Sequence, residues 1–280
     1  QPAFVEPPSF FVEIPYQTID LVSEWFNAHS PCSGVPLHPV LQAEAIVERQ
    51  PDGAAIVESI EHFGPHRLFG IRTTTSTPVP NGPTVLSHST AYEHRIGSGR
   101  IWAEMAREFA GLGMTALRYD RRGTGDSGTT TTELSRIYSE DSRADIAAAV
   151  SAAGVSPDCL MMTGVCSGAW NSAIAAIGSG AHSVVLVNII GFALRQNESD
   201  PDTSTAGSSG AMLKRNAKSF IRRRIPYAAW LLLGKLGLAQ VPEVLLAQLR
   251  SRDVRTDIVL SPEDLTWFEE QHGRRSLARV

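Results

Sequence analysis

The sequence predicts an α/β fold, with a mostly parallel, doubly wound sheet that carries a helical insertion. Between residues 84 and 191, short apolar runs rich in β-branched residues alternate with helical patterns, which is typical of βαβ units. The alternation stops over residues 192–250 and resumes at residue 251. With 280 residues, of which 42% are hydrophobic, the chain can bury the core of one large domain.

The N-terminal part is predicted to contain one helix and one pair of antiparallel strands. Residues 1–15 form a lead-in rich in proline and phenylalanine, and residues 16–28 show helical periodicity. That periodicity comes from Ile19, Val22, Trp25 and Phe26. Two β-branched stretches, residues 55–60 and 68–73, flank the turn signal Gly64-Pro65 and are expected to pair.

The alternating part predicts the remaining elements. The expected strands cover residues 84–87, 115–119, 159–165, 183–189 and 256–260. The expected helices cover residues 101–112, 141–153, 167–177 and 265–271. In the first helix we expect a buried stripe of Ile101, Trp102, Met105, Phe109 and Leu112, and in the second we expect Ile146 and Val150 to face inward. Residues 277–280 are expected to begin one more strand, so the chain is interpreted as ending before the last strand of its sheet.

These patterns divide the chain into three parts. Residues 1–50 are an N-terminal extension with a short helix, and residues 51–191 together with 251–280 form the α/β core. Residues 192–250 are a cap or lid insertion. The insertion is basic, with nine Lys and Arg residues against four Asp and Glu.

Charge and cysteine content exclude several classes of protein. The net charge of −4 gives no reason to expect a nucleic-acid partner. Three cysteines without a C-x-x-C pair indicate a reducing compartment, so we expect a cytoplasmic location. No run of about 18 apolar residues predicts a membrane span, and no signal peptide is visible. The chain begins with Gln1, which suggests a fragment or a processed chain.

The segment "TGVCSGAW", residues 163–170, follows a predicted strand and opens a predicted helix. It places Gly164 and Gly168 two residues before and after Cys166. A nucleophile on a strained strand-to-helix turn needs small residues at both of these places. A frame centred on Ser167 would place Val165 and Ala169 there, which fits less well. A buried core thiol is the other interpretation of Cys166.

A thiol at this turn suits nucleophilic catalysis. A helix N-terminus favours the thiolate, and a neighbouring histidine would favour it further. The thiolate would attack an acyl carbon and form an acyl-enzyme intermediate.

Three motifs carry a resemblance to a known family. The segments Gly164–Gly168 and Asp120–Ser127 (DRRGTGDS) resemble the nucleophile elbow and the fourth-strand turn of the α/β-hydrolase superfamily. The segment "EHRIGSGR", residues 93–100, resembles serine-aminopeptidase-like members, and the cysteine resembles the nucleophile of dienelactone hydrolases. The resemblance covers residues 55–191 and, less fully, 251–280. It implies an α/β-hydrolase fold that acts without a cofactor.

The resemblance also implies where an oxyanion hole would lie. The backbone N–H of Ser167 would supply one hydrogen bond, and Ser89, Thr90 or Ala91 would supply the second. The family usually has a glycine near position 91, so the second donor stays open. His94 and Arg95 lie on the same loop, where they would line the pocket or anchor the loop.

The sequence identifies the acid and the base of a catalytic triad less clearly than the nucleophile. Asp264 is the expected acid after the seventh strand, with Glu263 as its rival, and either could be an ordinary acid at a helix N-terminus. The family order places a histidine after an eighth strand. His272 comes only eight residues after Asp264 and is interpreted as a surface helix residue, so we expect the catalytic histidine to lie beyond Val280.

Two other motifs are interpreted as structural. Gly123, Gly125 and Gly128 match a dinucleotide-binding pattern, but a run of threonines follows where a helix should open. Glu61-His62 and His66 lack the spacing of a metal site, so no metal is expected.

The sequence therefore predicts an acyl hydrolase of the esterase, thioesterase or lactonase type that acts on a small-molecule acyl substrate. The basic insertion suggests that coenzyme A or a carrier protein delivers the acyl group. An acyltransferase and a non-catalytic binding domain on the same fold are the alternatives.

Overall fold

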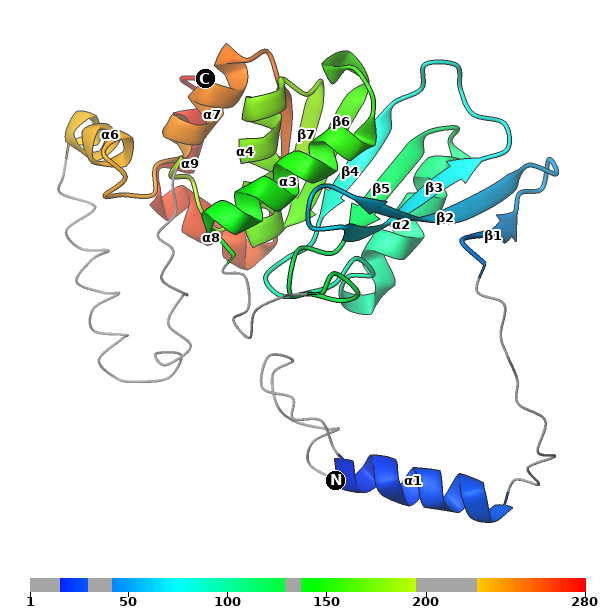
Figure 1. Ribbon diagram of the computed structural model, residues 1–280. Coiled ribbons are helices and arrows are strands. Elements are labelled where there is room, and N and C mark those ends of the chain that lie inside the picture. Colours follow the sequence, from blue (N-terminus) through cyan, green and yellow to red (C-terminus); the bar gives the residue numbers. More distant parts are fainter. Residues whose placement is uncertain (1–15, 30–41, 129–136, 195–225) are drawn as a thin grey trace. The chain divides into compact units, whose positions relative to one another are not determined.

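The computed structural model describes residues 16–29, 42–128, 137–194 and 226–280 (Figure 1). The chain divides into two compact units, residues 1–42 and residues 43–280. In the first unit, helix α1 (Tyr16–His29) confirms the predicted helix, and none of its side chains is buried. Its large apolar side chains are between 46% exposed (Ile19) and 65% exposed (Tyr16).

The second unit is built on an eight-stranded sheet of order β1-β2-β3-β5-β4-β6-β7-β8 (Figure 1). β1 (Glu44–Arg49), β2 (Ala55–Phe63), β3 (Leu68–Thr75) and β5 (Thr115–Tyr119) pair antiparallel in that order. From β5 onward the pairing is parallel through β4 (Thr84–His88), β6 (Leu160–Val165), β7 (Ser183–Val187) and β8 (Arg255–Val259). The mostly parallel sheet is therefore confirmed.

Strand β1 was not predicted, because three of its six residues are charged and no alternation marks it. Its pairing with β2 brings it into the sheet. The compact unit that contains the sheet spans Ala43–Val280.

Helices cover the sheet on both faces because successive strand residues point to opposite sides. Leu117 and Tyr119 of β5 join the core that α3 (Glu140–Ala153) and α4 (Ser167–Ser179) cover. Arg118, between them, faces the other way and binds Glu58, which also binds Arg107 of α2 (Ile101–Gly111). Figure 1 shows α3 and α4 in front of the strands.

Two predictions about local structure are wrong. Helix α2 buries Trp102, Ala103, Ala106 and Ala110, while Ile101 and Leu112 of the predicted stripe are 41% and 68% exposed. Alanines let this helix approach the sheet closely, so its buried face is not its most apolar one. Residues 277–280 do not begin a strand: α8 (Pro262–Glu270) is followed by helix α9 (Gly273–Leu277).

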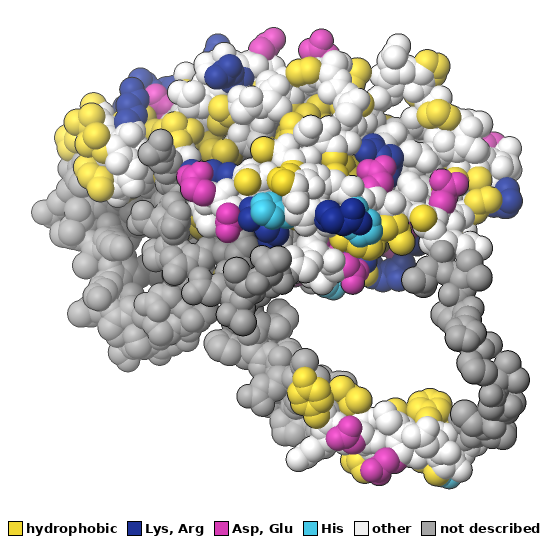
Figure 2. Space-filling model, viewed as in Figure 1, with side chains coloured by type: hydrophobic (Ala, Val, Ile, Leu, Met, Phe, Trp, Pro, Cys, Tyr) yellow, Lys and Arg dark blue, Asp and Glu magenta, His cyan; other side chains and the backbone are white. Residues whose placement is uncertain are grey.

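The expected insertion is described only from residue 226, so its basic segment 214–224 lies outside the described residues. Helix α6 (Tyr227–Lys235) has an apolar outer side, on which Leu232 is 58% exposed (Figure 2). Helix α7 (Pro242–Ser251) contacts α4 and β8, and its Leu245 and Leu249 are fully buried in the main core. Helix α7 therefore packs as part of the main core. Within the described ranges no helix is long and apolar enough to cross a membrane.

Candidate active site

Cys166 occupies the turn between the end of β6 and the start of α4. Its φ of 58° and ψ of −118° place it in a strained conformation that residues with a Cβ rarely adopt. A Cβ on Gly164 would lie 2.3 Å from the backbone of Gly168, and a Cβ on Gly168 would lie 2.3 Å from the carbonyl oxygen of His88. Both glycines are therefore required for the elbow to form. The Cys166 side chain is partly exposed, and its backbone N–H donates to the carbonyl of Val187 at 2.9 Å.

Tyr138 is a neighbour of Cys166 that the sequence did not reveal. It lies just before α3 and packs edge-on against Trp170 of α4, with ring centroids 5.1 Å apart. Burial raises the pKa of the Tyr138 phenol to about 12, and the nearby Cys166 side chain contributes to the increase. The phenol thus keeps its proton at neutral pH and remains a hydrogen-bond donor.

The loop after β4 meets the first residue of α4. The backbone N–H of Ala91 donates to the hydroxyl of Ser167 at 2.8 Å, and the Thr90 hydroxyl lies 3.4 Å from the same oxygen. Ala91 has a φ of 39°, a left-handed value that glycine adopts more readily than alanine. The structure thus brings together Thr90, Ala91 and Ser167, as predicted for an oxyanion hole, but the Ala91 N–H is already bonded.

Arg121 holds the other side of the same loop residue. Its guanidinium donates to the carbonyl oxygen of Ala91 and, at 3.0 Å, to the hydroxyl of Ser142 on α3. Arg121 is only 4% exposed, and none of the described carboxylates forms an ion pair with it. Burial lowers the pKa of Arg121. The sequence offered only the second residue of the DRRG segment as a signal.

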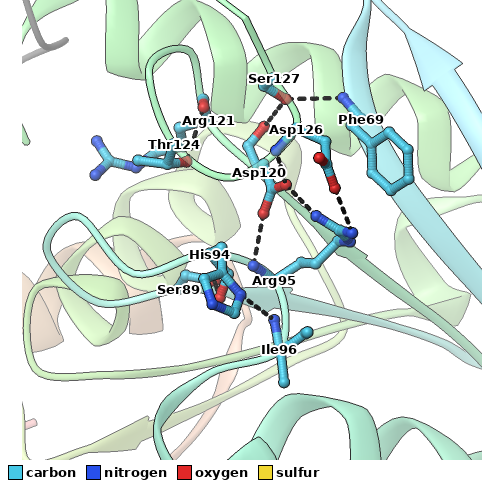
Figure 3. Close-up of polar contacts among 10 residues, drawn as sticks. All are labelled: Phe69, Ser89, His94, Arg95, Ile96, Asp120, Arg121, Thr124, Asp126 and Ser127. Atoms are coloured by element: carbon cyan, nitrogen blue, oxygen red, sulfur yellow. Dashed lines mark hydrogen bonds and ion pairs between the residues drawn. The ribbon is translucent and has the colours of Figure 1, made fainter. Parts of the chain in front are cut away.

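Arg95 anchors the loop instead of lining an open pocket (Figure 3). Its backbone N–H and its guanidinium both bind the fully buried carboxylate of Asp120, with the N–H at 2.6 Å from Oδ1. The guanidinium also binds Asp126 at 2.6 Å and lies 4.1 Å above the ring of Phe69. His94 is exposed, and its Nδ1 accepts from the N–H of Ile96 at 3.3 Å.

Ser89 supports the same loop from inside. It is buried, and its hydroxyl donates to the carbonyl of His94 at 3.3 Å (Figure 3). Ser89 thus acts within the loop, and no described contact joins its side chain to Cys166.

The glycine-rich turn after β5 has a structural explanation. A Cβ on Gly125 would lie 2.1 Å from the carboxylate of Asp120, so only glycine lets the turn close over that buried group. The Ser127 hydroxyl donates to the carbonyl of Asp120 and accepts from the N–H of Phe69, both at 2.8 Å. The turn therefore folds on Asp120, and its close contact with that carboxylate accounts for Gly125.

His88 is a buried histidine beside the loop that the sequence did not single out. Its Nδ1 lies 3.0 Å from the Tyr119 hydroxyl, and its Nε2 has no hydrogen-bond partner. Burial, with a smaller contribution from Arg121, lowers the pKa of His88 to about 3. His88 is thus neutral at physiological pH and is enclosed by the protein.

The expected acid lies in the first turn of α8. The Asp264 carboxylate accepts from the Ser261 hydroxyl at 2.9 Å, and the Asp264 N–H donates to Ser261 Oγ at 3.2 Å. The Ser261 N–H donates to the side chain of Asn188, which follows β7, at 2.7 Å. Asp264 is therefore held close to the end of β7, while Glu263 is exposed.

The described hydrogen bonds of the histidines lead to groups other than Cys166 and Asp264. His272 precedes α9 with a φ of 62° and packs edge-on against Tyr227, with ring centroids 5.5 Å apart. The imidazoles of His29, His88 and His94 are joined to Trp25, Tyr119 and Ile96. The described ranges contain no group of three or more His, Cys, Asp and Glu side chains placed to bind a metal ion.

Proteins of known structure resemble this chain only distantly. No family model and no curated protein matches the chain. Solved structures that are similar include acetyl xylan esterase 1 from Thermoanaerobacterium sp., with 15% identity, a TM-score of 0.44, and coverage of 83% of this chain and 88% of that one. An acetyl xylan esterase from Paenibacillus sp. R4 has 16% identity, a TM-score of 0.44, and coverage of 99% and 98%. A thioesterase domain of the curacin biosynthetic pathway has 17% identity, a TM-score of 0.43, and coverage of 78% and 90%.

These likenesses are too distant to bear on the reaction, which has to be inferred from the site itself. The strand order and the strand–turn–helix at Cys166 are those of the α/β-hydrolase fold.

Proposed function

We propose that this protein is an acyl hydrolase that uses Cys166 as its nucleophile. The observation that carries the proposal is the conformation of Cys166, which is strained, partly exposed and located at the N-terminus of the 13-residue helix α4. Strain of this kind persists only where the surrounding structure imposes it, and here two glycine contacts do so. A cysteine that only fills the core would need neither the strained conformation nor the two glycines.

The chemistry follows from this placement. The thiolate attacks the carbonyl carbon of an ester or thioester, the C–S bond forms, and the carbonyl electron pair moves to the oxygen. The backbone N–H of Ser167 stabilises that oxyanion. Its collapse expels the alkoxide or thiolate, which takes up a proton, and leaves a thioester on Cys166. Attack by water then releases a carboxylic acid and restores the thiol.

The second step needs a general base, for which a histidine oriented by Asp264 is our proposal. Attack by another alcohol or thiol in place of water would make the same site an acyltransferase. Delivery of the acyl group by coenzyme A or by a carrier protein fits the basic composition of residues 192–250.

A non-catalytic binding domain is the second candidate. It is favoured by one observation: the hydrogen bonds described for the Asp264 carboxylate and backbone N–H go to the Ser261 hydroxyl at the start of α8. In that case the elbow would survive as a structural feature while the chemistry was lost.

Covalent labelling separates the candidates. The chain is incubated with p-nitrophenyl acetate, and peptides are analysed by mass spectrometry. We expect acetylation of Cys166, which Cys166→Ala abolishes and Cys159→Ala leaves intact. Cys159 is the matched control because it is also a partly exposed free thiol, located before β6. Equal labelling of the two cysteines, labelling of Ser167, or no labelling at all would contradict the proposal.

A further inference from the structure

The backbone N–H of Ala91 is a candidate for the second donor of the oxyanion hole, and two buried side chains hold Ala91 in place. The N–H of Ala91 donates to Ser167 Oγ at 2.8 Å, and the carbonyl oxygen of Ala91 accepts from the Arg121 guanidinium. Ser167 is 2% exposed and Arg121 is 4% exposed. Turning the Ala91 amide toward a substrate would therefore disrupt a hydrogen bond on each side of the residue.

The hydroxyl of Ser167 lies between the Ala91 N–H and the Thr90 hydroxyl. A serine hydroxyl has one proton to donate and two lone pairs to accept with. The Ala91 N–H occupies one lone pair of Ser167, and the other described polar atom near its oxygen is Thr90 Oγ1, at 3.4 Å. Either hydroxyl can be the donor in this pair, in which Ser167 is buried and Thr90 is partly exposed.

We propose that the Thr90 hydroxyl, and not the backbone amide of the loop, supplies the second hydrogen bond to the oxyanion formed at Cys166. In this arrangement Ser167 is a positioning residue, since its hydroxyl donates to Thr90 Oγ1 and leaves the Thr90 proton for the oxyanion. The Ser167 N–H supplies the first hydrogen bond. Hydrogen bonds in a chain polarise one another, so acceptance from Ala91 makes the hydroxyls better donors. No proton is transferred along this chain of hydrogen bonds. This inference rests on the proposed function, because it assigns the oxyanion donor of the same site.

Two reagents that react with the same thiol test the proposal. p-Nitrophenyl acetate acylates Cys166 through an oxyanion, whereas iodoacetamide alkylates it without forming one. For Thr90→Val we expect the acylation rate constant to fall roughly 10- to 100-fold, below the loss seen when a strong oxyanion-hole donor is removed. We expect the alkylation rate to be unchanged. Thr90→Ser, which keeps the hydroxyl, should restore acylation.

The sign of the effect in Ser167→Ala decides between the two donors. Removing this hydroxyl breaks the chain to Thr90, so we expect slower acylation. It also frees the Ala91 amide, and faster acylation would show that this amide is the donor and would overturn the proposal. Equal acylation of wild type and Thr90→Val would also overturn it while leaving Cys166 as the nucleophile. If neither reagent modified Cys166, the proposed function itself would fail.

Discussion

Replacing Gly168 by alanine tests the contact on which the elbow depends. An alanine Cβ at this position would lie 2.3 Å from the carbonyl oxygen of His88, 3.0 Å from that of Ser89 and 3.1 Å from the carbonyl carbon of His88. Side-chain carbons essentially never approach closer than 3.0 Å, so helix α4 and the end of β4 would have to separate by roughly 0.7 Å. The contacted atoms belong to backbone at the end of a buried strand, which cannot move aside as a flexible side chain would.

The expected loss of stability is about 2 kcal/mol. Overpacking a rigid site costs about 1–3 kcal/mol, and the rigid backbone places this site at the upper end. Alanine in place of glycine inside a helix stabilises the folded state by roughly 0.5–1 kcal/mol, which offsets part of this loss. For a domain of this size the melting temperature should fall by about 4–8 °C.

Gly178 provides the matched control, because it lies in the same helix and has nothing within 4 Å of its would-be Cβ. Gly178→Ala should therefore be neutral or stabilising by up to about 1 kcal/mol. The free energy of unfolding of both variants is measured by urea denaturation, and their melting temperatures by calorimetry. If Gly168→Ala were as stable as Gly178→Ala, the close approach of α4 to β4 would be refuted, and with it the explanation of the elbow.

Two further predictions concern the buried histidine and the core boundary. The pKa of His88 is about 3 in the folded chain and 6.5 in the unfolded chain, so the unfolded state binds more protons between these values. The free energy of unfolding should then fall as the pH drops from about 6.5 toward 3, with a contribution of up to about 1.4 kcal/mol per pH unit that His88→Gln removes. Leu245→Ala on the fully buried face of α7 should cost about 2–5 kcal/mol in urea denaturation. Leu232→Ala on the exposed side of α6 should stay within about 0.5 kcal/mol, and equal effects would show that α7 lies outside the core.

The sequence was sufficient to predict the alternation of strands and helices and the elbow. Each of these features is local: β-branched runs mark strands, and two glycines around Cys166 mark a turn that only small neighbours permit. Local patterns misplaced the buried face of α2, however. The stripe with the largest apolar residues was expected to face inward, and Trp102 of that stripe is buried. The rest of the buried face is formed by Ala103, Ala106 and Ala110, since close packing against the sheet favours small side chains.

Only the tertiary structure decided which groups of the site are hydrogen-bonded to one another. The hydrogen bond from Ala91 to Ser167 joins residues 76 positions apart, and the one from Arg121 to Ala91 joins residues 30 positions apart. Such partners depend on the sheet order, which places β4 between β5 and β6 and so brings the ends of all three strands together. The sequence by itself determined that Cys166 could occupy a strained turn, because that property depends on its two glycine neighbours. Which groups surround the thiol, and in which direction each donor points, was fixed by strands that meet only after the chain has folded.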